Sequence, residues 1–338
     1  MLDGMGGDDA PGVVVEGAVL AAEQMAVEDT ICIIGKEELI NAELAKYSYD
    51  AEKITVYNAE EQIEMNDAPV KAVRTKKDSS MVVGINKVKT GEGDLFVSAG
   101  NTGALMAGGL FILGRIQGID RPALASVYPM LGGEPSLLVD AGANSECKPN
   151  NLLEFAMMGS IYMEKVLGRT EPTVGLVNLG VEENKGSTLT KAAYELLDKS
   201  HMNFAGNVEA REVPRGACDV IVCDGFVGNV ILKLTEGLAM NILSLVKKKF
   251  TEGPKAMIGA MFLKDKLGEL KSEFDYSEYG GAPILGVKGA VIKMHGSSNA
   301  NAVKNTILKG IPFAEEGVVQ KIQNSVLEIE EIVNSDQE

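Results

Sequence analysis

Short glycine-rich segments with small polar side chains follow several apolar stretches of this sequence. The first is SAGNTGA (98–104), in which Ser98, Asn101 and Thr102 are polar. A helix that begins near Asn101 presents unpaired backbone N–H groups and the positive end of its dipole, and the two glycines let a ligand approach the backbone. These features are typical of an anion site, usually for phosphate. Close packing of a helix on a sheet, which also needs small residues, is an equal alternative.

Four further segments have the same character: DAGANSE (140–146), NLGVEENKG (178–186), CDGFVGN (223–229) and KMHGSS (293–298). Ligands of open α/β sheets bind where strands end at their carboxyl edge. If the sheet is parallel, all five segments converge on one crevice, and we predict that they do. Taken singly, each is more often an ordinary turn.

The elements that must position these segments alternate along the chain. We predict strands at 30–34, 54–57, 94–97, 123–128, 136–139, 173–177, 203–205, 220–223 and 290–293, and helices at 11–25, 150–167, 188–200 and 229–250. Runs such as LLVD and VIVCD are continuously apolar, as in strands buried on both faces. The pattern predicts a three-layer α/β/α sandwich with a mostly parallel, Rossmann-like sheet, formed by residues 1–338 as one catalytic unit.

Composition and motifs exclude several classes of function. The net charge of −16 excludes nucleic acid as a partner, because the phosphate backbone demands a basic surface. Neither a P-loop nor a complete dinucleotide fingerprint is present, so we expect a small anion rather than ATP or NAD, with no cofactor and no metal. The four cysteines have no metal-site or disulfide spacing and indicate free thiols in the cytoplasm. No apolar run approaches the ~20 residues of a membrane span.

Together the motifs resemble one family. MGGDDAP, SAGNTGALM, GRIQGIDRPALA, VDAGAN, EENKGS, DGFVGN, EYGGAPILGVKG and KMHGSSNANAV are similar to those of the bacterial acyl-acyl-carrier-protein:phosphate acyltransferases (PlsX), over nearly the whole chain. Two departures stand out: only two residues precede Asp3, so we expect either that the first strand is nearly absent or that the sequence is trimmed, and Asp9 occupies the position of the family's histidine. We assign Asp9 no role.

The resemblance implies that inorganic phosphate attacks the thioester of a long-chain acyl carrier protein, giving acyl phosphate for phospholipid synthesis. It also implies a fold of the phosphotransacetylase and isocitrate dehydrogenase type, a homodimer, and no metal. No protein nucleophile is required, because phosphate is the nucleophile. The implied partners are acyl carrier protein, phosphate, the membrane surface and a membrane acyltransferase, with the enzyme cytoplasmic and peripherally associated with the membrane.

Site residues follow from the resemblance and from the residue types. We expect Lys185, His295 and Asn229 to be catalytic, Lys185 as a phosphate ligand and His295 as a donor to phosphate or to the oxyanion. Taken alone, Lys185 is a surface lysine, His295 is more often structural and Asn229 is a helix cap. The residues expected to bind phosphate or substrate are Ser98, Asn101, Thr102, Asp140, Asn144, Asp224, Ser297 and Ser298. Ser297 and Ser298 also suit a helix N-cap.

Two basic clusters are candidates for docking the acidic carrier protein. The first contains Arg74, Lys76 and Lys77, and the second contains Arg115 and Arg121. An enzyme of net charge −16 must concentrate positive charge locally to receive an acidic partner. A solvated helix face is the usual alternative for such runs.

Residues 235–275 predict a helical hairpin with more apolar surface than its own pairing covers. One helix carries Leu238, Ile242 and Leu245 on a stripe, and the segment after Gly253-Pro254 resumes helical spacing with an apolar cluster near the turn. We expect the hairpin to form a four-helix bundle across a twofold axis, and its tip to contact anionic lipid. Ordinary core packing is the alternative.

Three other functions remain open. The first is a phosphate acyltransferase of the same fold that uses acyl-CoA, as the phosphate acetyl- and butyryltransferases do. The second is a noncatalytic acyl-phosphate or lipid-synthesis scaffold. A dehydrogenase is the weakest, because the dinucleotide fingerprint and a metal-binding carboxylate cluster are missing from the sequence.

Overall fold

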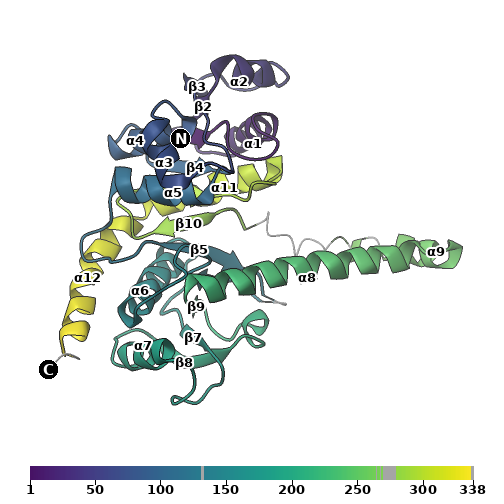
Figure 1. Cartoon of the computed structure of the whole chain (residues 1–338). Helices are drawn as coiled ribbons and strands as arrows, with labels where there is room; N and C mark the ends of the chain where they lie inside the picture. The colour runs from purple at the N-terminus through teal and green to yellow at the C-terminus, as the bar shows by residue number, and fades with distance from the viewer. Residues whose placement is uncertain (131–132, 264, 267, 269–278, 336–338) are drawn as a thin grey trace.

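The computed structural model describes residues 1–130, 133–263, 265–266, 268 and 279–335, and its centre is one large sheet (Figure 1). The strand order is β3-β2-β1-β4-β11-β10-β5-β6-β9-β7-β8. The strands are β1 (Leu2–Asp3), β2 (Ile31–Gly35), β3 (Ile54–Asn58), β4 (Leu95–Ser98), β5 (Ala123–Tyr128), β6 (Ser136–Val139), β7 (Val174–Asn178), β8 (Phe204–Glu209), β9 (Val220–Val222), β10 (Ala282–Leu285) and β11 (Ala290–Lys293).

The sheet is mostly parallel, but its direction reverses along its width. β3, β2, β1, β4 and β11 are mutually parallel. β10 is antiparallel to β11, β5 is antiparallel to β10, and β6 is antiparallel to β5. β9, β7 and β8 then run parallel to β6. After three reversals, β6, β9, β7 and β8 point opposite to β1, β4 and β11.

Helices cover both faces of the sheet. The main ones are α1 (Gly12–Ala22), α2 (Glu37–Leu44), α3 (Pro69–Thr75), α4 (Ser80–Lys89), α5 (Thr102–Gly108), α6 (Pro149–Lys165), α7 (Thr188–Asp198), α8 (Gly225–Thr251), α9 (Pro254–Phe262), α11 (Ala300–Glu315) and α12 (Val318–Ser335); a π-helical turn, Gly109–Leu113, extends α5, and a 3₁₀ turn covers Val213–Arg215. The core has two parts, one on each face.

The two parts of the core show why the strands are apolar throughout. Leu137 and Val139 of β6 belong to the apolar cluster that includes residues of α1, α6, α7, α11 and α12, whereas Leu138 belongs to the cluster on the other face, with residues of α3, α4, α5 and the start of α8. Successive strand side chains point to opposite faces, so a strand between two helical layers needs apolar residues at every position. The predicted three-layer α/β/α sandwich is confirmed, and each predicted strand and helix is present with small differences at its ends.

Two strands differ from the expectation. β1 is short, but it pairs with both β2 and β4. β10 is absent from the prediction, because Pro283 interrupts its strand pattern and a proline cannot donate to a sheet ladder.

α8 extends away from the body of the protein, with α9 at its far end (Figure 1). Asp224, not Asn229, caps α8, since its side chain accepts a hydrogen bond from the Val227 N–H at 2.9 Å. Within the described residues, α8 is the one helix long and apolar enough to cross a membrane, a weak indication that the sequence expectation did not include. Lys264 and residues 269–275 of the predicted hairpin lie outside the described residues.

Candidate active site

The carboxyl ends of β1, β4 and β11, which we call the first edge, bring three loops together. These loops are residues 4–9, 99–101 and 294–298. The Met294 N–H donates to the Ser98 carbonyl and the Asp8 N–H donates to the Gly296 carbonyl, both at 2.8 Å. SAGNTGA and KMHGSS are therefore neighbours, as predicted.

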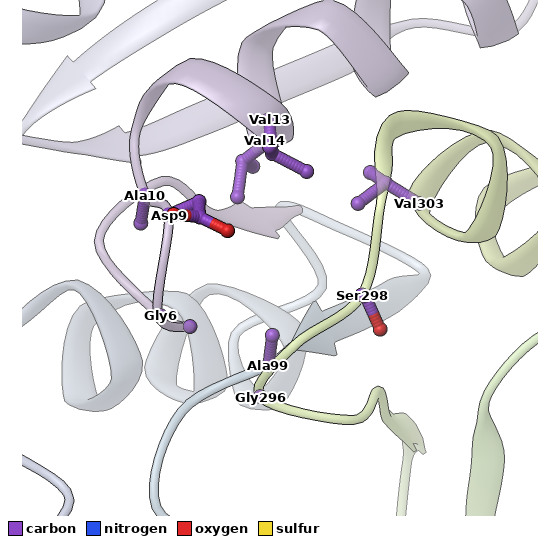
Figure 2. Close-up of a pocket in the computed structure, with 10 residues that line it drawn as sticks. Gly6, Asp9, Ala10, Val13, Val14, Ala99, Gly296, Ser298 and Val303 are labelled. Atoms are coloured by element: carbon purple, nitrogen blue, oxygen red, sulfur yellow. The ribbon is translucent and has the colours of Figure 1, made fainter.

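A small pocket lies between the three first-edge loops and the start of α1 (Figure 2). Gly6, Ala99, Gly296 and Ser298 form one part of its wall, and the carboxylate of Asp9 points toward the enclosed space. Backbone and small side chains make up most of these loop walls, as close approach of a ligand to the main chain requires.

Asn101 and Thr102 lie at the start of α5, as predicted. The Asn101 side chain accepts from the Ala104 N–H at 3.0 Å and donates to carbonyls of residues 64, 65 and 67. These contacts occupy Asn101 as a helix cap and loop tether. The backbone N–H groups of the first turn, beginning at Thr102, are the groups that suit an anion.

His295 is exposed at the first edge with a defined tautomer. The Ser297 N–H donates to His295 Nδ1 at 3.2 Å, and Ser297 Oγ lies 2.8 Å from the same nitrogen. An Nδ1 that accepts leaves the proton of the neutral ring on Nε2, which can donate to a ligand. Burial, followed by the charge of Lys233 on α8, lowers the pKa of His295, which favours this neutral form. Asn299 caps α11, so the predicted cap at Ser297 or Ser298 is wrong.

The opposite edge of the sheet, which we call the second edge, gathers the loops after β6, β9 and β7. Asp140 organises it: one carboxylate oxygen accepts from the N–H groups of Leu124, Gly142 and Ala143, and the other accepts from the N–H and Nδ2 of Asn144. Asn144 Nδ2 also donates to the Pro122 carbonyl at 2.8 Å. Asp140 and Asn144 thus hold the loop. The Asp140 carboxylate already accepts hydrogen bonds at both oxygens and is unsuited to binding a phosphate.

α8 begins at the second edge and crosses the sheet to the first. The Gly225 N–H donates to the Asn144 carbonyl at 2.7 Å, and farther along Tyr128 Oη lies 2.8 Å from Thr235 Oγ1. Asn229 is exposed, and a Cβ on Gly142 would lie 3.3 Å from its side chain. Asn229 precedes Lys233, the residue whose charge acts on His295, by about 6 Å of helix.

Lys185 is exposed in the loop after β7 at the second edge. Its backbone is fixed, because Asn178 Nδ2 donates to the Lys185 carbonyl at 3.1 Å. β7 lies six strands from β4 in the sheet order, or about 29 Å at ~4.8 Å per strand, and it ends at the opposite edge. The prediction that all five loops converge on one crevice is therefore wrong: Lys185, Asp140, Asn144 and Asp224 lie at the second edge, whereas Ser98, Thr102 and His295 lie at the first. Asn229 lies on α8, which runs from the second edge to the first.

The two basic clusters contact different elements. In the first, the Arg74 guanidinium lies 5.6 Å from the Phe111 ring centre, Lys76 pairs with Asp67 at 2.6 Å, and Lys77 donates to the Val73 carbonyl. The Asn101 side chain reaches the same 64–67 loop. In the second, Arg115 pairs with Asp120 at 3.3 Å, and exposed Arg121 precedes β5 by one residue.

Three buried ionisable residues escaped the sequence prediction. They are Asp3 and Lys293 at the first edge and Glu154 on α6, each less than 8% exposed. Glu154 accepts from the N–H groups of Asp120 and Arg121, and burial raises its pKa to about 7. The available signal was a charged residue at the end of an apolar strand, as in the AVIK of β11.

The described residues offer neither a reactive cysteine nor a metal site. Burial, with the nearby charges of Asp140 and Asp224, raises the pKa of Cys147 to about 11, so that it stays a thiol. Among the described residues, no three His, Cys, Asp or Glu side chains are grouped so that they could hold a metal ion.

The chain has many relatives of known name. Residues 1–321 match the family described as fatty acid synthesis protein. The phosphate acyltransferase of Alkaliphilus oremlandii is 56% identical over 326 residues, which is 96% of either chain, and that of Clostridioides difficile is 52% identical over 96% of this chain and 95% of its own. A phosphotransacetylase structure from Streptococcus pyogenes superposes with a TM-score of 0.57 at 18% identity, covering 88% of this chain and 91% of the other, and shows that the fold is shared.

Full-length identity above 50% leaves the family in no doubt, and the resemblance seen in the motifs is confirmed. This chain belongs to the phosphate acyltransferase (PlsX) family and is an enzyme that transfers acyl groups to phosphate.

Proposed function

We propose that this enzyme moves a long-chain acyl group from acyl-[acyl-carrier-protein] to inorganic phosphate, giving acyl phosphate for phosphatidic acid synthesis. The observation that carries the proposal is the first edge, where the loop before α5 lies beside the loop that holds His295, and the buried cation Lys293 donates to the Ala99 carbonyl. Such a group of donors suits a phosphate nucleophile and a developing oxyanion.

The reaction needs few protein groups. Ser98 is fully buried and its hydroxyl is bonded to Asp3 and Gly100, so it shapes the loop and does not contact the ligand. Phosphate binds at the first-edge loops through Thr102, Ser297 and Ser298 and attacks the thioester carbonyl. His295 Nε2–H donates to the developing oxyanion, and the thiolate of the carrier leaves with little help because a thiol is acidic enough, with a pKa of ~8.5. No covalent enzyme intermediate forms.

Thiol release tests the donor. The enzyme is mixed with phosphate and either palmitoyl-acyl carrier protein or palmitoyl-CoA, and free thiol is followed with time. We expect release from the carrier protein at a much higher kcat/KM. Faster release from palmitoyl-CoA would support the CoA-dependent alternative, and release from neither would contradict a long-chain acyl thioester as the donor.

Of the two basic clusters, we propose that the first docks the carrier protein, because it adjoins the loop that Asn101 tethers at the first edge. Lys76 is committed to Asp67 and to the Gln62 carbonyl, so Arg74 and Lys77 are the residues to change. Their reversal to Glu should raise the carrier-protein KM about tenfold at low salt and less at high salt. An unchanged KM, with a shift on reversing Arg115 and Arg121 instead, would move docking to the second edge.

Lys185 takes part in this reaction only if a second copy of the chain supplies it, since its own first edge is about 29 Å away. We propose a homodimer in which Lys185 and Asn229 face the partner's first edge. An exposed apolar stripe of α8, with Leu234 67% and Leu238 57% exposed, supports such a contact.

Mixed dimers test the shared site. The Lys185→Ala and His295→Ala substitutions are made in separate chains, and the two variant proteins are mixed, unfolded and refolded together. Random pairing makes half of the dimers mixed. If the two subunits share each site, every mixed dimer has one intact site of two, so about a quarter of wild-type activity returns. No recovery would remove Lys185 from the phosphate site.

We also propose that α9 at the tip of the hairpin rests on the membrane, where an insoluble acyl phosphate passes to a membrane acyltransferase. Met261 and Phe262 are 78% and 86% exposed, and Lys255 is exposed nearby. Exposed apolar side chains flanked by lysine are typical of contact with anionic lipid. The enzyme is then cytoplasmic and peripherally membrane-associated.

A further inference from the structure

Lys293 is a buried lysine at the end of β11, and the reaction described above gives it no step. Three apolar residues precede it in the strand, and its side chain is only 7% exposed. A buried ammonium is costly unless acceptors and opposite charges compensate it, so lysine is rarely found in such a place.

Lys293 stands at the end of a row of three polar residues across neighbouring strands. It pairs with Ser98 of β4, and Leu2 of β1 pairs with Val97, so that Asp3 lies beside Ser98 on the other side. Ser98 Oγ donates to the Asp3 carboxylate at 2.6 Å and accepts from the Gly100 N–H at 3.0 Å. An acid, a hydroxyl and an amine thus flank the start of the 99–101 loop.

The ammonium of Lys293 fixes that loop through its backbone. Nζ donates to the Ala99 carbonyl at 3.3 Å and to the Met294 carbonyl. Ala99 lines the first-edge pocket (Figure 2). Among the described residues these carbonyls are the acceptors of Lys293, which leaves one of its three N–H donors.

The neighbouring charges do not neutralise this cation. Burial of Asp3 raises the pKa of its carboxyl, so the nearest acid holds its proton more tightly. Burial lowers the pKa of Lys293 to about 8, the charges of Asp3 and Asp8 raise it, and the charge of Lys233 lowers it. A cation in a medium of low dielectric constant, with its opposite charge incomplete, favours a bound anion close by.

We propose that Lys293 is a positioning residue for phosphate: its buried ammonium holds the 99–101 loop through Ala99 and supplies positive charge next to that loop at the first edge. The proposal rests on the proposed function, because it assigns the phosphate of that reaction to the first-edge loops. Lys293 touches the loop backbone, and acts on the anion through that backbone and through its charge.

Anion binding measured without an acyl donor tests the proposal independently of turnover. Phosphate and sulfate are titrated calorimetrically into the wild type, Lys293→Met, Lys293→Arg and the control Lys288→Met. Methionine keeps the shape but removes the charge, arginine keeps the charge, and Lys288 is exposed just before the same strand. At pH 7 we expect Lys293→Met to bind both anions at least tenfold more weakly, with Lys293→Arg and Lys288→Met within threefold of the wild type.

In turnover, Lys293→Met should raise the KM for phosphate at least tenfold and change kcat less, a split that a merely structural role would not produce. Wild-type anion affinity and phosphate KM in a folded Lys293→Met protein would overturn the proposal. A wild type that binds phosphate but releases thiol from neither donor would reject the proposed function and leave this inference intact.

The pH dependence of the wild type provides a test that needs no variant to fold. Sulfate keeps one charge state from pH 6.5 to 9.5, and anion binding must raise the pKa of Lys293, so sulfate affinity should fall about tenfold or more as pH rises through about 8. Asp3, Asp8, Lys233, Glu236 and His295 also face this region; the pKa of His295 is lowered, so it is neutral throughout most of that range. A flat sulfate affinity would overturn the proposal.

Discussion

Replacing Asp140 with alanine should destabilise the protein strongly, because one carboxylate organises the whole second-edge loop. It accepts hydrogen bonds from the N–H groups of Leu124, Gly142, Ala143 and Asn144, and from Asn144 Nδ2. Asp140 itself is fully buried. Alanine leaves all of these donors without their acceptor.

The magnitude follows from how many donors water can reach. Gly142 is exposed and water replaces its lost acceptor, Ala143 and Asn144 are half-buried, and Leu124 is buried. A buried unpaired donor costs about 1–3 kcal/mol, so one full and two partial losses give roughly 3–5 kcal/mol. That is a large part of the ~5–15 kcal/mol by which a native protein is stable.

Urea unfolding at one fixed protein concentration measures this loss, because association would otherwise shift the apparent stability. Asp224→Ala is the matched control: Asp224 caps α8 in the same loop group with a single bond, to Val227, and its loss should cost about 1 kcal/mol. The loss of unfolding free energy for Asp140→Asn should lie between those of the two alanine variants, since the amide N–H of the new side chain would face the Asn144 donors. A loss below about 1 kcal/mol for Asp140→Ala would refute the reasoning.

Three further predictions concern the site, pH and the hairpin. Lys185→Ala should lower turnover at least ~100-fold by removing a charge that orients phosphate, measured as thiol release; normal turnover and phosphate dependence would rule Lys185 out. The pKa of Glu154 is raised from 4.5 to about 7 in the folded protein, so its contribution to the free energy of unfolding is fully present below pH 4.5 and falls as pH rises to about 7, by at most roughly 3 kcal/mol. Urea titrations at several pH values should show that this pH dependence is lost in Glu154→Gln. The same pH dependence in both proteins would contradict the prediction. Replacing both Met261 and Phe262 with Glu should abolish flotation with anionic liposomes, while sedimentation still shows the wild-type oligomer. Unchanged flotation would place the membrane contact elsewhere. Loss of the oligomer would assign the tip to the subunit interface.

Local features of the chain were predictable from sequence because they depend on neighbouring residues. Continuous apolar runs predicted strands buried on both faces, and the polar residue before an apolar helix predicted Asn101 at the start of α5. The motifs also identified the family, which depends on residue identity and not on how loops meet. These inferences use periodicity and spacing over a few residues.

The direction of the strands was decided by tertiary structure, and it separated loops that sequence reasoning had grouped. β10 was not predicted because Pro283 interrupts its strand pattern. Without β10, the antiparallel pairings of β11 with β10 and of β10 with β5 could not be predicted. One signal was present: only seven residues separate β5 from β6, which suits an antiparallel pair, whereas a parallel crossover needs a dozen or more.

The sequence by itself determined the elements, the family and which residue types were available for chemistry. Tertiary structure alone decided that Lys293 and Asp3 flank Ser98, that Asp140 is filled by backbone donors, and that Lys185 lies at the far edge. The physical reason is that a side chain's partners depend on strand order and direction, which are set by pairings between residues far apart in the chain, whereas periodicity records only which face of its own element a residue occupies.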